Sequence, residues 1–301
     1  MIIGGDKSAV IENIRRNVRA GELNRKAELD DPQLTDAEAD AVLAAWEKYR
    51  NRKLYYFVKS RGARAIVEVA WLLHKGRTEF EGLEKLDELD DGAIVTSNHF
   101  NPIDSIFARA VLRRKFGKTP YIVSQETNFA MKGMNGYLIR NLRMIPILKR
   151  PNYLIKKFVP RVRELVNAGE FVQIYPEEEL WFNYRKPRPC KRGSYLFAAQ
   201  VGAPVVPIFV EMIDLDKDDN EQFVQLKYVV HVLDIIYPDP TKSHKQNSIE
   251  MAEKDYAERV ACYEKCYGKK FDYKFSYADI AGYKKGIKKT GASVAHAGKK
   301  D

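Results

Sequence analysis

The sequence is poor in cysteine and has no long hydrophobic run, and both shortages exclude classes of protein. Three cysteines among 301 residues are too few for a disulfide framework, and no secretory signal opens the chain, so we expect a reduced, intracellular protein. The longest apolar stretch, residues 65–73, is cut by Glu68 and is about half the roughly 20 residues of a membrane span, so no transmembrane helix is predicted. Ordinary glycine and proline contents without a repeat exclude collagen and coiled-coil classes.

Acidic residues are absent from two stretches that are rich in basic ones. The chain has 51 Lys and Arg against 41 Asp and Glu, a formal charge of +10. Residues 127–163 and 180–210 hold nine and five of the basic residues and no acid. A solvated face usually mixes both signs, so the pattern indicates an anionic partner: nucleic acid, an anionic membrane or a phosphorylated small molecule. No nucleic-acid-binding module accompanies these stretches, so nucleic acid is not predicted.

Hydrophobic periodicity divides the chain into three parts. Residues 1–75 are predicted to form an N-terminal helical arm, in which Thr35 and Glu38 have the spacing of a capping box. Residues 76–283 alternate β-rich runs with helical stretches, which predicts an α/β domain whose central, mostly parallel sheet is flanked by helices. Residues 284–301 are predicted to be a flexible basic tail that either contacts anionic lipid or only aids solubility.

The elements expected in the α/β domain are short and regular. Strands are predicted at residues 93–97, 120–123, 144–148, 171–175 and 205–210, with a further strand or pair of strands within 223–236. Helices are predicted at residues 103–116, 153–168, 194–201 and 247–267.

The helix expected at residues 54–74 combines aromatic side chains, such as Tyr55 and Trp71, with several lysines and arginines. This composition suits the headgroup region of a membrane, and it suits equally a helix packed on the protein's own core. Gly62 weakens a continuous membrane face, so both alternatives remain.

Cys262 and Cys266 lie four residues apart on a predicted helix, a spacing that can seat a metal ion. No histidine is close enough in sequence to complete a familiar zinc pattern, so two idle thiols are favoured and no metal site is predicted.

His99 and Asp104 follow the first strand of the domain. Asn101 is a suitable N-cap and Pro102 suits the first helical position, so the helix is expected to begin there with Asp104 at its third residue. Open α/β sheets bind ligands at the carboxyl ends of their strands, and a carboxylate one turn away would hold the imidazole as a general base. The alternatives are a simple turn histidine and a carboxylate that only serves the helix N-terminus.

Charged residues also end two later strands. Arg150 follows the strand at 144–148, where it is placed to bind phosphate or is an ordinary exposed cation. Glu177 lies in an acidic turn after the strand at 171–175, and Lys191 and Arg192 precede a helix whose backbone N–H groups can join them around an anion.

Taken in order, these segments resemble the glycerolipid acyltransferase family typified by 1-acylglycerol-3-phosphate acyltransferase. The first family motif, Asn-His-x4-Asp, is matched at Asn98, His99 and Asp104, and the second, an apolar strand ending in Arg, is matched at Arg150. The third, Phe-Pro-Glu-Gly-Thr-Arg, is matched only as Tyr175-Pro176-Glu177. The fourth is matched by residues 206–208, and residues 191–193 match the basic-Gly step before it, so the resemblance covers roughly residues 76–210.

Two positions depart from the family pattern. Glu178, Glu179 and Leu180 stand where the family has Gly, Thr and Arg, so the usual phosphate-facing cation is missing, with Arg185 or Arg188 as candidates to replace it. Met144 replaces the glycine that often opens the second motif.

The resemblance implies transfer of a fatty acyl group from acyl-CoA or acyl-carrier protein to a hydroxyl of a lysophospholipid such as 1-acylglycerol-3-phosphate. It implies His99 as general base and Asp104 as its orienting partner. Arg150, with Lys191 or Arg192, would hold the acceptor phosphate, and Glu177 would help position the acceptor. No permanently bound cofactor and no covalent acyl-enzyme are expected. The alternatives are a different acceptor, or a non-catalytic relative that binds anionic lipid.

The partners expected are therefore the acyl thioester donor, the lysophospholipid acceptor and an anionic membrane surface. The predicted location is the cytoplasm, with peripheral attachment to the inner face of the membrane.

Overall fold

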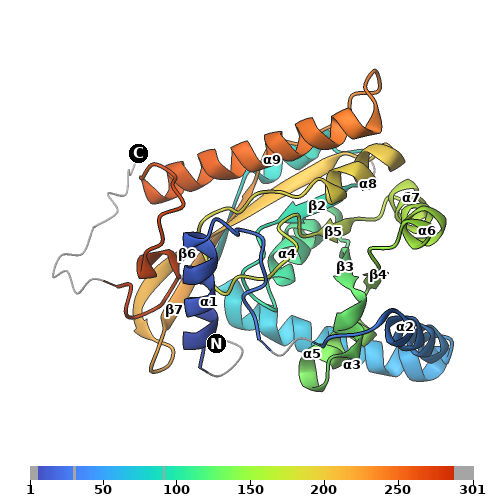
Figure 1. Ribbon diagram of the computed structural model, residues 1–301, viewed down its shortest axis with the longest axis horizontal. Helices are drawn as coiled ribbons and strands as arrows, with labels where there is room; N and C mark the ends of the chain where they lie inside the picture. The colour runs from blue at the N-terminus through green and yellow to red at the C-terminus, as the bar shows by residue number, and fades with distance from the viewer. Residues whose placement is uncertain (1–5, 30–31, 91, 288–301) are drawn as a thin grey trace.

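A seven-stranded sheet forms the centre of the computed structural model, which describes residues 6–29, 32–90 and 92–287 (Figure 1). The strands are β1 (Thr78–Glu81), β2 (Ile94–Ser97), β3 (Tyr121–Gln125), β4 (Met144–Ile147), β5 (Val172–Ile174), β6 (Val205–Asp218) and β7 (Val224–Val232). The helices are α1 (Ser8–Arg19), α2 (Asp36–Arg50), α3 (Lys53–Lys75), α4 (Ser105–Phe116), α5 (Gly133–Asn141), α6 (Pro151–Tyr153), α7 (Val159–Asn167), α8 (Gly193–Val201) and α9 (His244–Tyr267).

The strand order is β1-β7-β6-β2-β5-β3-β4, and neighbouring strands are parallel except for β6 and β7. The predicted α/β class with a mostly parallel sheet is therefore confirmed. β2 lies in the middle between β5 and β6 and is buried along its whole length. Its central position places the turn that follows it over the middle of the sheet, at the edge where strands β5, β3 and β4 also end.

Helices cover both faces of the sheet, because successive strand residues point to opposite sides. Val95 of β2 joins a cluster with α4 and with residues of α3, such as Trp71. Its neighbour Ile94 joins a cluster on the other face with α7, α8 and α9. The site-bearing turn therefore leaves a strand that is held by packing on both sides.

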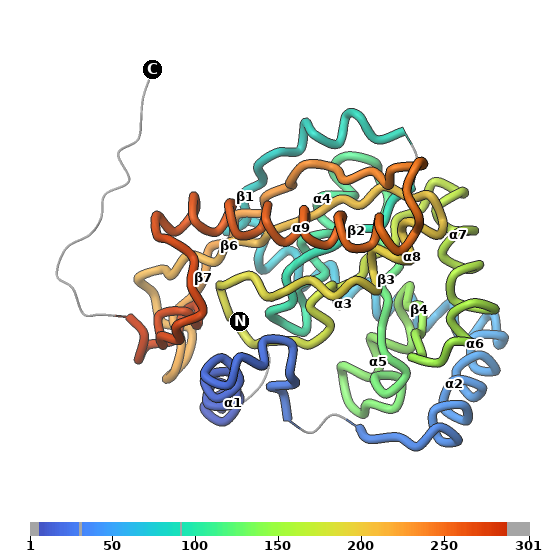
Figure 2. The backbone as a smooth tube through the Cα atoms, turned by 45° about the horizontal axis from the view of Figure 1, so that its top comes forward, coloured from blue at the N-terminus to red at the C-terminus, as the bar shows by residue number. Residues whose placement is uncertain are grey.

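Helix α1 packs far from α2, on the part of the domain formed by the end of the chain (Figure 2). Ile11 and Ile14 are fully buried in a cluster that includes Trp181, Phe223 and Tyr283. The first helix and the last described residues therefore share one small core.

Several expected element boundaries differ from the structure. The capping box of Thr35 and Glu38 at the start of α2 is confirmed. Strand β1 and helix α5 were not predicted, and α4 begins at Ser105 rather than at Pro102, because residues 101–104 form a turn around Asn101.

Of the basic tail predicted at residues 284–301, the part from residue 288 onward lies outside the described residues. Lys284 itself is described, and its ammonium lies 2.8 Å from the carboxylate of Asp218 on β6. Among the helices of the described ranges, none combines the length and the apolar character needed to cross a membrane.

Candidate active site

The turn after β2 begins at an asparagine that is fixed to the next strand. The side chain of Asn98 donates to the carbonyl of Val210 at 3.1 Å and accepts from the amide of the same residue at 2.9 Å. This two-point contact with β6 anchors the turn at its first residue. His99 follows directly and is partly exposed, with 19% of its side-chain surface accessible.

Asp104 holds the imidazole from the other end of the turn. Its Oδ2 accepts from His99 Nδ1 at 2.8 Å, from the amide of Phe100 at 2.8 Å and from the amide of Asn101 at 3.1 Å. The carboxylate is buried, with 2% of its side chain exposed. Because a carboxylate only accepts, Nδ1 carries the proton in this contact and Nε2 is left as the basic nitrogen. The structure thus brings His99 and Asp104 together as the spacing predicted.

Tyr175 completes this arrangement, although the sequence predicts no role for its side chain. Its hydroxyl donates to Asp104 Oδ1 at 2.6 Å, and its ring stacks on the imidazole of His99 with centroids 3.8 Å apart. Burial, together with the charge of Asp104, raises the pKa of Tyr175 well above its ordinary value, so the hydroxyl stays a donor. The sequence signal was the tyrosine in place of the phenylalanine of the third family motif.

Glu177 is buried below the turn rather than open to a ligand. Its Oε2 accepts from the amide of His99 at 3.3 Å and from the guanidinium of Arg188 at 2.7 Å, and its Oε1 accepts from the amide of Arg188 at 3.1 Å. Arg188 is 1% exposed and also donates to the carbonyls of His99 and Glu179. Arg188 is therefore engaged inside the protein, and this buried pair fixes the backbone that carries the imidazole.

Arg185, the other candidate for the missing phosphate-facing cation, is also engaged inside the protein. It pairs with Asp214 and donates to the carbonyls of Ala278 and Met212. Neither arginine is therefore free to replace that cation in this structure.

Glu178 bridges two of the basic residues that end up near this turn. Its Oε2 lies 2.8 Å from the ammonium of Lys149 and 2.9 Å from that of Lys191. Burial favours a raised pKa for Glu178, but the two lysines outweigh burial and lower the pKa. Glu178 has φ of 64°, a left-handed conformation that favours glycine, which is the residue the family has at this position.

Arg150 and Arg192 occupy different surroundings from the imidazole. The guanidinium of Arg150 binds the carboxylate of Asp40 at 2.8 and 2.9 Å and lies 3.2 Å from Asp36, both on α2. Arg192 is exposed and stands at the N-cap position of α8. The structure therefore connects Lys191 to the acidic turn next to Glu177, while the side chain of Arg150 faces α2.

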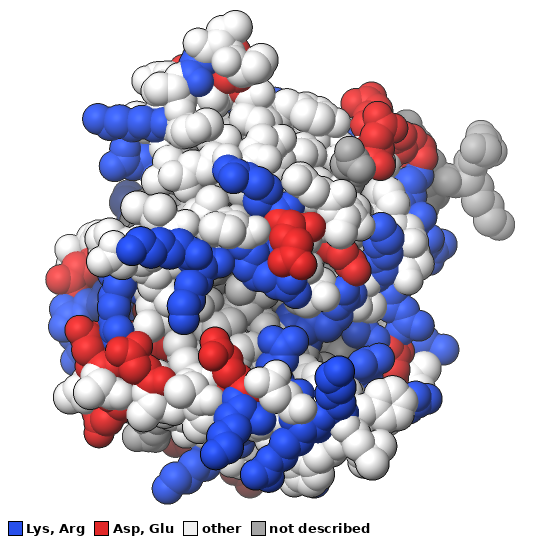
Figure 3. Space-filling view, turned by 90° about the vertical axis from the view of Figure 1, so that its right-hand side faces the viewer, with Lys and Arg blue, Asp and Glu red and all other residues white. Residues whose placement is uncertain are grey.

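A hollow of about 510 Å³ is lined by residues of α4, including Ser105 next to Asp104, and by residues of α3, α5 and the first residues of β3 and β4. Its lining combines apolar side chains, including Tyr56, Val67 and Met144, with arginines such as Arg109 and Arg143. On the side of the molecule that carries α2, α6 and α7, lysines and arginines gather around a depression with fewer acidic side chains among them (Figure 3).

Comparisons with known proteins agree with this geometry. Residues 77–211 match the model of the family described as Acyltransferase. Over 165 residues the chain is 27% identical to the chloroplastic 1-acyl-sn-glycerol-3-phosphate acyltransferase BAT2 of Brassica napus, a match that covers 54% of this chain and 44% of that protein. The matched part thus spans less than half the length of that relative.

A solved structure is also similar. It is the crystal structure of the 1-acyl-sn-glycerophosphate acyltransferase PlsC of Thermotoga maritima, with 18% identity, a TM-score of 0.47, and coverage of 78% of this chain and 90% of that chain. The resemblance seen in the motifs is borne out over the segment that holds them. The imidazole and carboxylate described above lie within residues 77–211, the segment that matches the acyltransferase family model and is similar to these acyltransferases.

Proposed function

We propose that this protein transfers a fatty acyl group from an acyl thioester, acyl-CoA or acyl-carrier protein, to a hydroxyl of a lysophospholipid such as 1-acylglycerol-3-phosphate. The observation that carries the proposal is the partly exposed imidazole of His99, whose Nδ1 is held by buried Asp104 and whose Nε2 is free to take a proton.

In this reaction Nε2 of His99 removes the proton of the acceptor hydroxyl as its oxygen attacks the thioester carbonyl. The tetrahedral intermediate then expels the thiolate, which takes the proton back from the imidazolium. Asp104 keeps the ring in one tautomer and stabilises its charge, and the hydroxyl of Tyr175 keeps Asp104 in place. We assign Glu177 and Arg188 a positioning role, because their hydrogen bonds go to the backbone of the His99 turn.

The acceptor phosphate is assigned to Lys149 and Lys191, with Arg192 and Arg150 as further cations. Glu178 holds the two lysines in the absence of substrate, so the phosphate must displace one carboxylate. The hollow beside α4 is assigned to the acyl chain, since Ser105, next to Asp104, is part of its lining and Val67, Leu142 and Met144 give it apolar surface. Val67→Phe narrows this hollow and is expected to shift the preferred donor to shorter acyl chains.

The experiment is an acyl-transfer assay with purified protein, acyl-CoA or acyl-carrier protein as donor, and a panel of lysolipids with and without a phosphate headgroup. His99→Ala should lower the rate by about 10²–10⁴-fold. The matched control is His244→Ala, since His244 is exposed at the start of α9. A folded His99→Ala variant as active as the control contradicts the assignment of the base.

The same panel tests the alternatives. Faster transfer to a neutral or zwitterionic lysolipid than to 1-acylglycerol-3-phosphate identifies a different acceptor. Binding of anionic vesicles without transfer from either donor identifies a non-catalytic lipid-binding protein.

We further propose that α3 rests on an anionic membrane surface. Leu54, Val58, Leu72 and Leu73 of this helix are each at least half exposed, and lysines and arginines flank them. Replacement of Leu54, Leu72 and Leu73 by Ser should weaken sedimentation with anionic vesicles. Ile155→Ser removes an equally exposed side chain from another part of the surface and is the control.

A further inference from the structure

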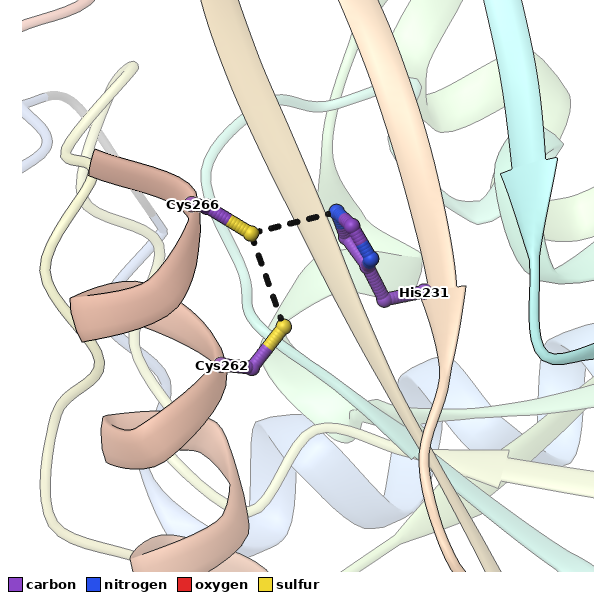
Figure 4. A group of neighbouring side chains, drawn as sticks. All are labelled: His231, Cys262 and Cys266. Atoms are coloured by element: carbon purple, nitrogen blue, oxygen red, sulfur yellow. Dashed lines mark hydrogen bonds between the residues drawn. The ribbon is translucent and has the colours of Figure 1, made fainter. Parts of the chain in front are cut away.

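Two cysteines and a histidine from distant parts of the chain meet on the sheet face below α9. Cys262 and Cys266 come from the second half of α9, and His231 comes from β7 (Figure 4). The two sulfurs are 3.8 Å apart, and His231 Nε2 is 3.3 Å from the sulfur of Cys266. All three ligand atoms lie within 4.8 Å of one another.

Two of these separations are close to the edges of a tetrahedral zinc site. Two sulfurs bound to zinc at about 2.3 Å are about 3.8 Å apart, and a sulfur and a nitrogen are about 3.6 Å apart. The observed sulfur–sulfur distance agrees with this value, and the sulfur–nitrogen distance of 3.3 Å differs from it by a few tenths of an ångström. The third pair, Cys262 and His231, lies within 4.8 Å, so side-chain adjustments are needed to bring all three atoms onto one ion.

The histidine is already oriented for this role. Its Nδ1 lies 3.2 Å from the carboxylate of Glu81, which leaves Nε2 facing the cysteines. Metal-bound histidines commonly donate their second ring nitrogen to a carboxylate in this way. A second carboxylate, Glu211, lies 3.0 Å from Nε2 and can supply the fourth ligand after a side-chain shift, in place of water.

We propose that His231, Cys262 and Cys266 bind one zinc ion that links α9 to the β6–β7 pair. Two thiolates and one imidazole are the donor set that zinc prefers over magnesium or calcium. Cys262 packs against Phe209, Leu233 and Tyr263, so the ion lies against an apolar wall. The site shares no residue with His99 and Asp104, and it is independent of the proposed acyl transfer.

The sequence had favoured two idle thiols, because the histidine lies 31 residues before Cys262 and reaches it only through the pairing of β7 with β6.

The test is the metal content of the full-length chain after incubation with zinc and removal of unbound ion. One zinc per chain is expected, and cobalt in the same site should show thiolate charge-transfer and tetrahedral d–d absorption. Cys262→Ser, Cys266→Ser and His231→Asn should each abolish stoichiometric binding. Cys190→Ser is the control and should bind normally, since Cys190 lies apart from the cluster against the α7–α8 side of the core.

Two measurements on the unaltered chain keep the test valid if a variant fails to fold. Zinc at one hundred times its Kd should raise the Tm by about 5 °C, and it should protect Cys262 and Cys266 from alkylation. Protein that binds no zinc, or that binds it equally in all four variants, overturns the proposal. A Cys262–Cys266 disulfide in protein purified without oxidant also overturns the proposal. The Glu211→Gln variant tests whether the fourth zinc ligand is the glutamate or water.

Discussion

Replacement of Asp104 by Asn tests how much of the catalysis depends on a carboxylate behind the imidazole. Asp104 accepts four hydrogen bonds, from His99 Nδ1, the amides of Phe100 and Asn101, and the hydroxyl of Tyr175. An asparagine oxygen can take over the three contacts of Oδ2, while its amide group then faces Tyr175. The tyrosine hydroxyl can turn and accept, so the variant is expected to fold with the turn intact.

The losses of stability and of catalytic rate in this variant then come mostly from the lost negative charge. Hydrogen bonds to an ionised group contribute about 1.5–3 kcal/mol and neutral ones about 0.5–1.5 kcal/mol, so Asp104→Asn should lower the free energy of unfolding by about 1–3 kcal/mol. Without the carboxylate the imidazolium formed during proton transfer loses its partner. We expect kcat/KM to fall by about 10²–10⁴-fold, which corresponds to about 3–5 kcal/mol of barrier.

The assay compares kcat/KM and urea unfolding for the Asp104→Asn, Tyr175→Phe and double variants. Tyr175→Phe removes one of the four contacts and should lower kcat/KM by less than about tenfold, the equivalent of about 1.4 kcal/mol. In the double variant the amide group introduced by Asp104→Asn is buried without an acceptor, so the stability loss should exceed the sum of the single losses. If His99→Ala shows its expected loss of about 10²–10⁴-fold while kcat/KM of Asp104→Asn stays within tenfold of the unaltered protein, the role given to Asp104 is refuted.

Three further predictions concern the acidic turn. Glu178→Gly and Glu178→Gln both lose the ion pairs with the lysines, but only glycine adopts the left-handed backbone conformation without strain. Urea unfolding should therefore show Glu178→Gly to be more stable than Glu178→Gln by about 1 kcal/mol. Equal stability of the two variants would contradict the backbone strain. Because the lysines lower the pKa of Glu178, the charged carboxylate stabilises the folded protein relative to Glu178→Gln. This difference in the free energy of unfolding should be fully present above pH 4.5, the ordinary pKa of the side chain, and should disappear at lower pH. Arg188→Met leaves the buried carboxylate of Glu177 without its ion-pair partner and should lower the free energy of unfolding by about 3–5 kcal/mol. Arg161→Met breaks an exposed ion pair and is the control, with an expected loss of less than about 1 kcal/mol. Similar losses in the two variants would refute the positioning role.

The part of the site that the sequence predicted is the part that is local in the chain. His99 and Asp104 lie in one short turn, so strand end, turn and carboxylate follow from neighbouring residues. Tyr175 joins them from a different strand, and its hydroxyl contact depends on β5 lying next to β2. Sequence periodicity predicts that both strands exist and says nothing about which strands are neighbours.

The contacts of the basic residues were also not predictable from the sequence, because their partners lie far away in the chain. Arg150 lies at the end of β4, close to its expected place, but its partners are Asp36 and Asp40 from a helix more than 100 residues earlier. The sequence predicts that the N-terminal arm is helical but not where it packs, so it could not predict these ion pairs. Strand β1 was missed because it has four residues and pairs with β7, about 150 residues away in the chain.

The ion pairs around Lys149, Lys191 and Arg150 have a consequence for how substrate binding responds to salt. An open basic site gathers mobile ions from solution, and a bound anion releases them, so affinity falls steeply as ionic strength rises. Here the carboxylates of Glu178 and Asp40 are covalently attached counterions that already occupy the cations. A phosphate that enters exchanges places with a carboxylate of the protein and releases few ions. The KM for a phosphorylated acceptor should therefore change little with ionic strength, although the chain as a whole is strongly basic.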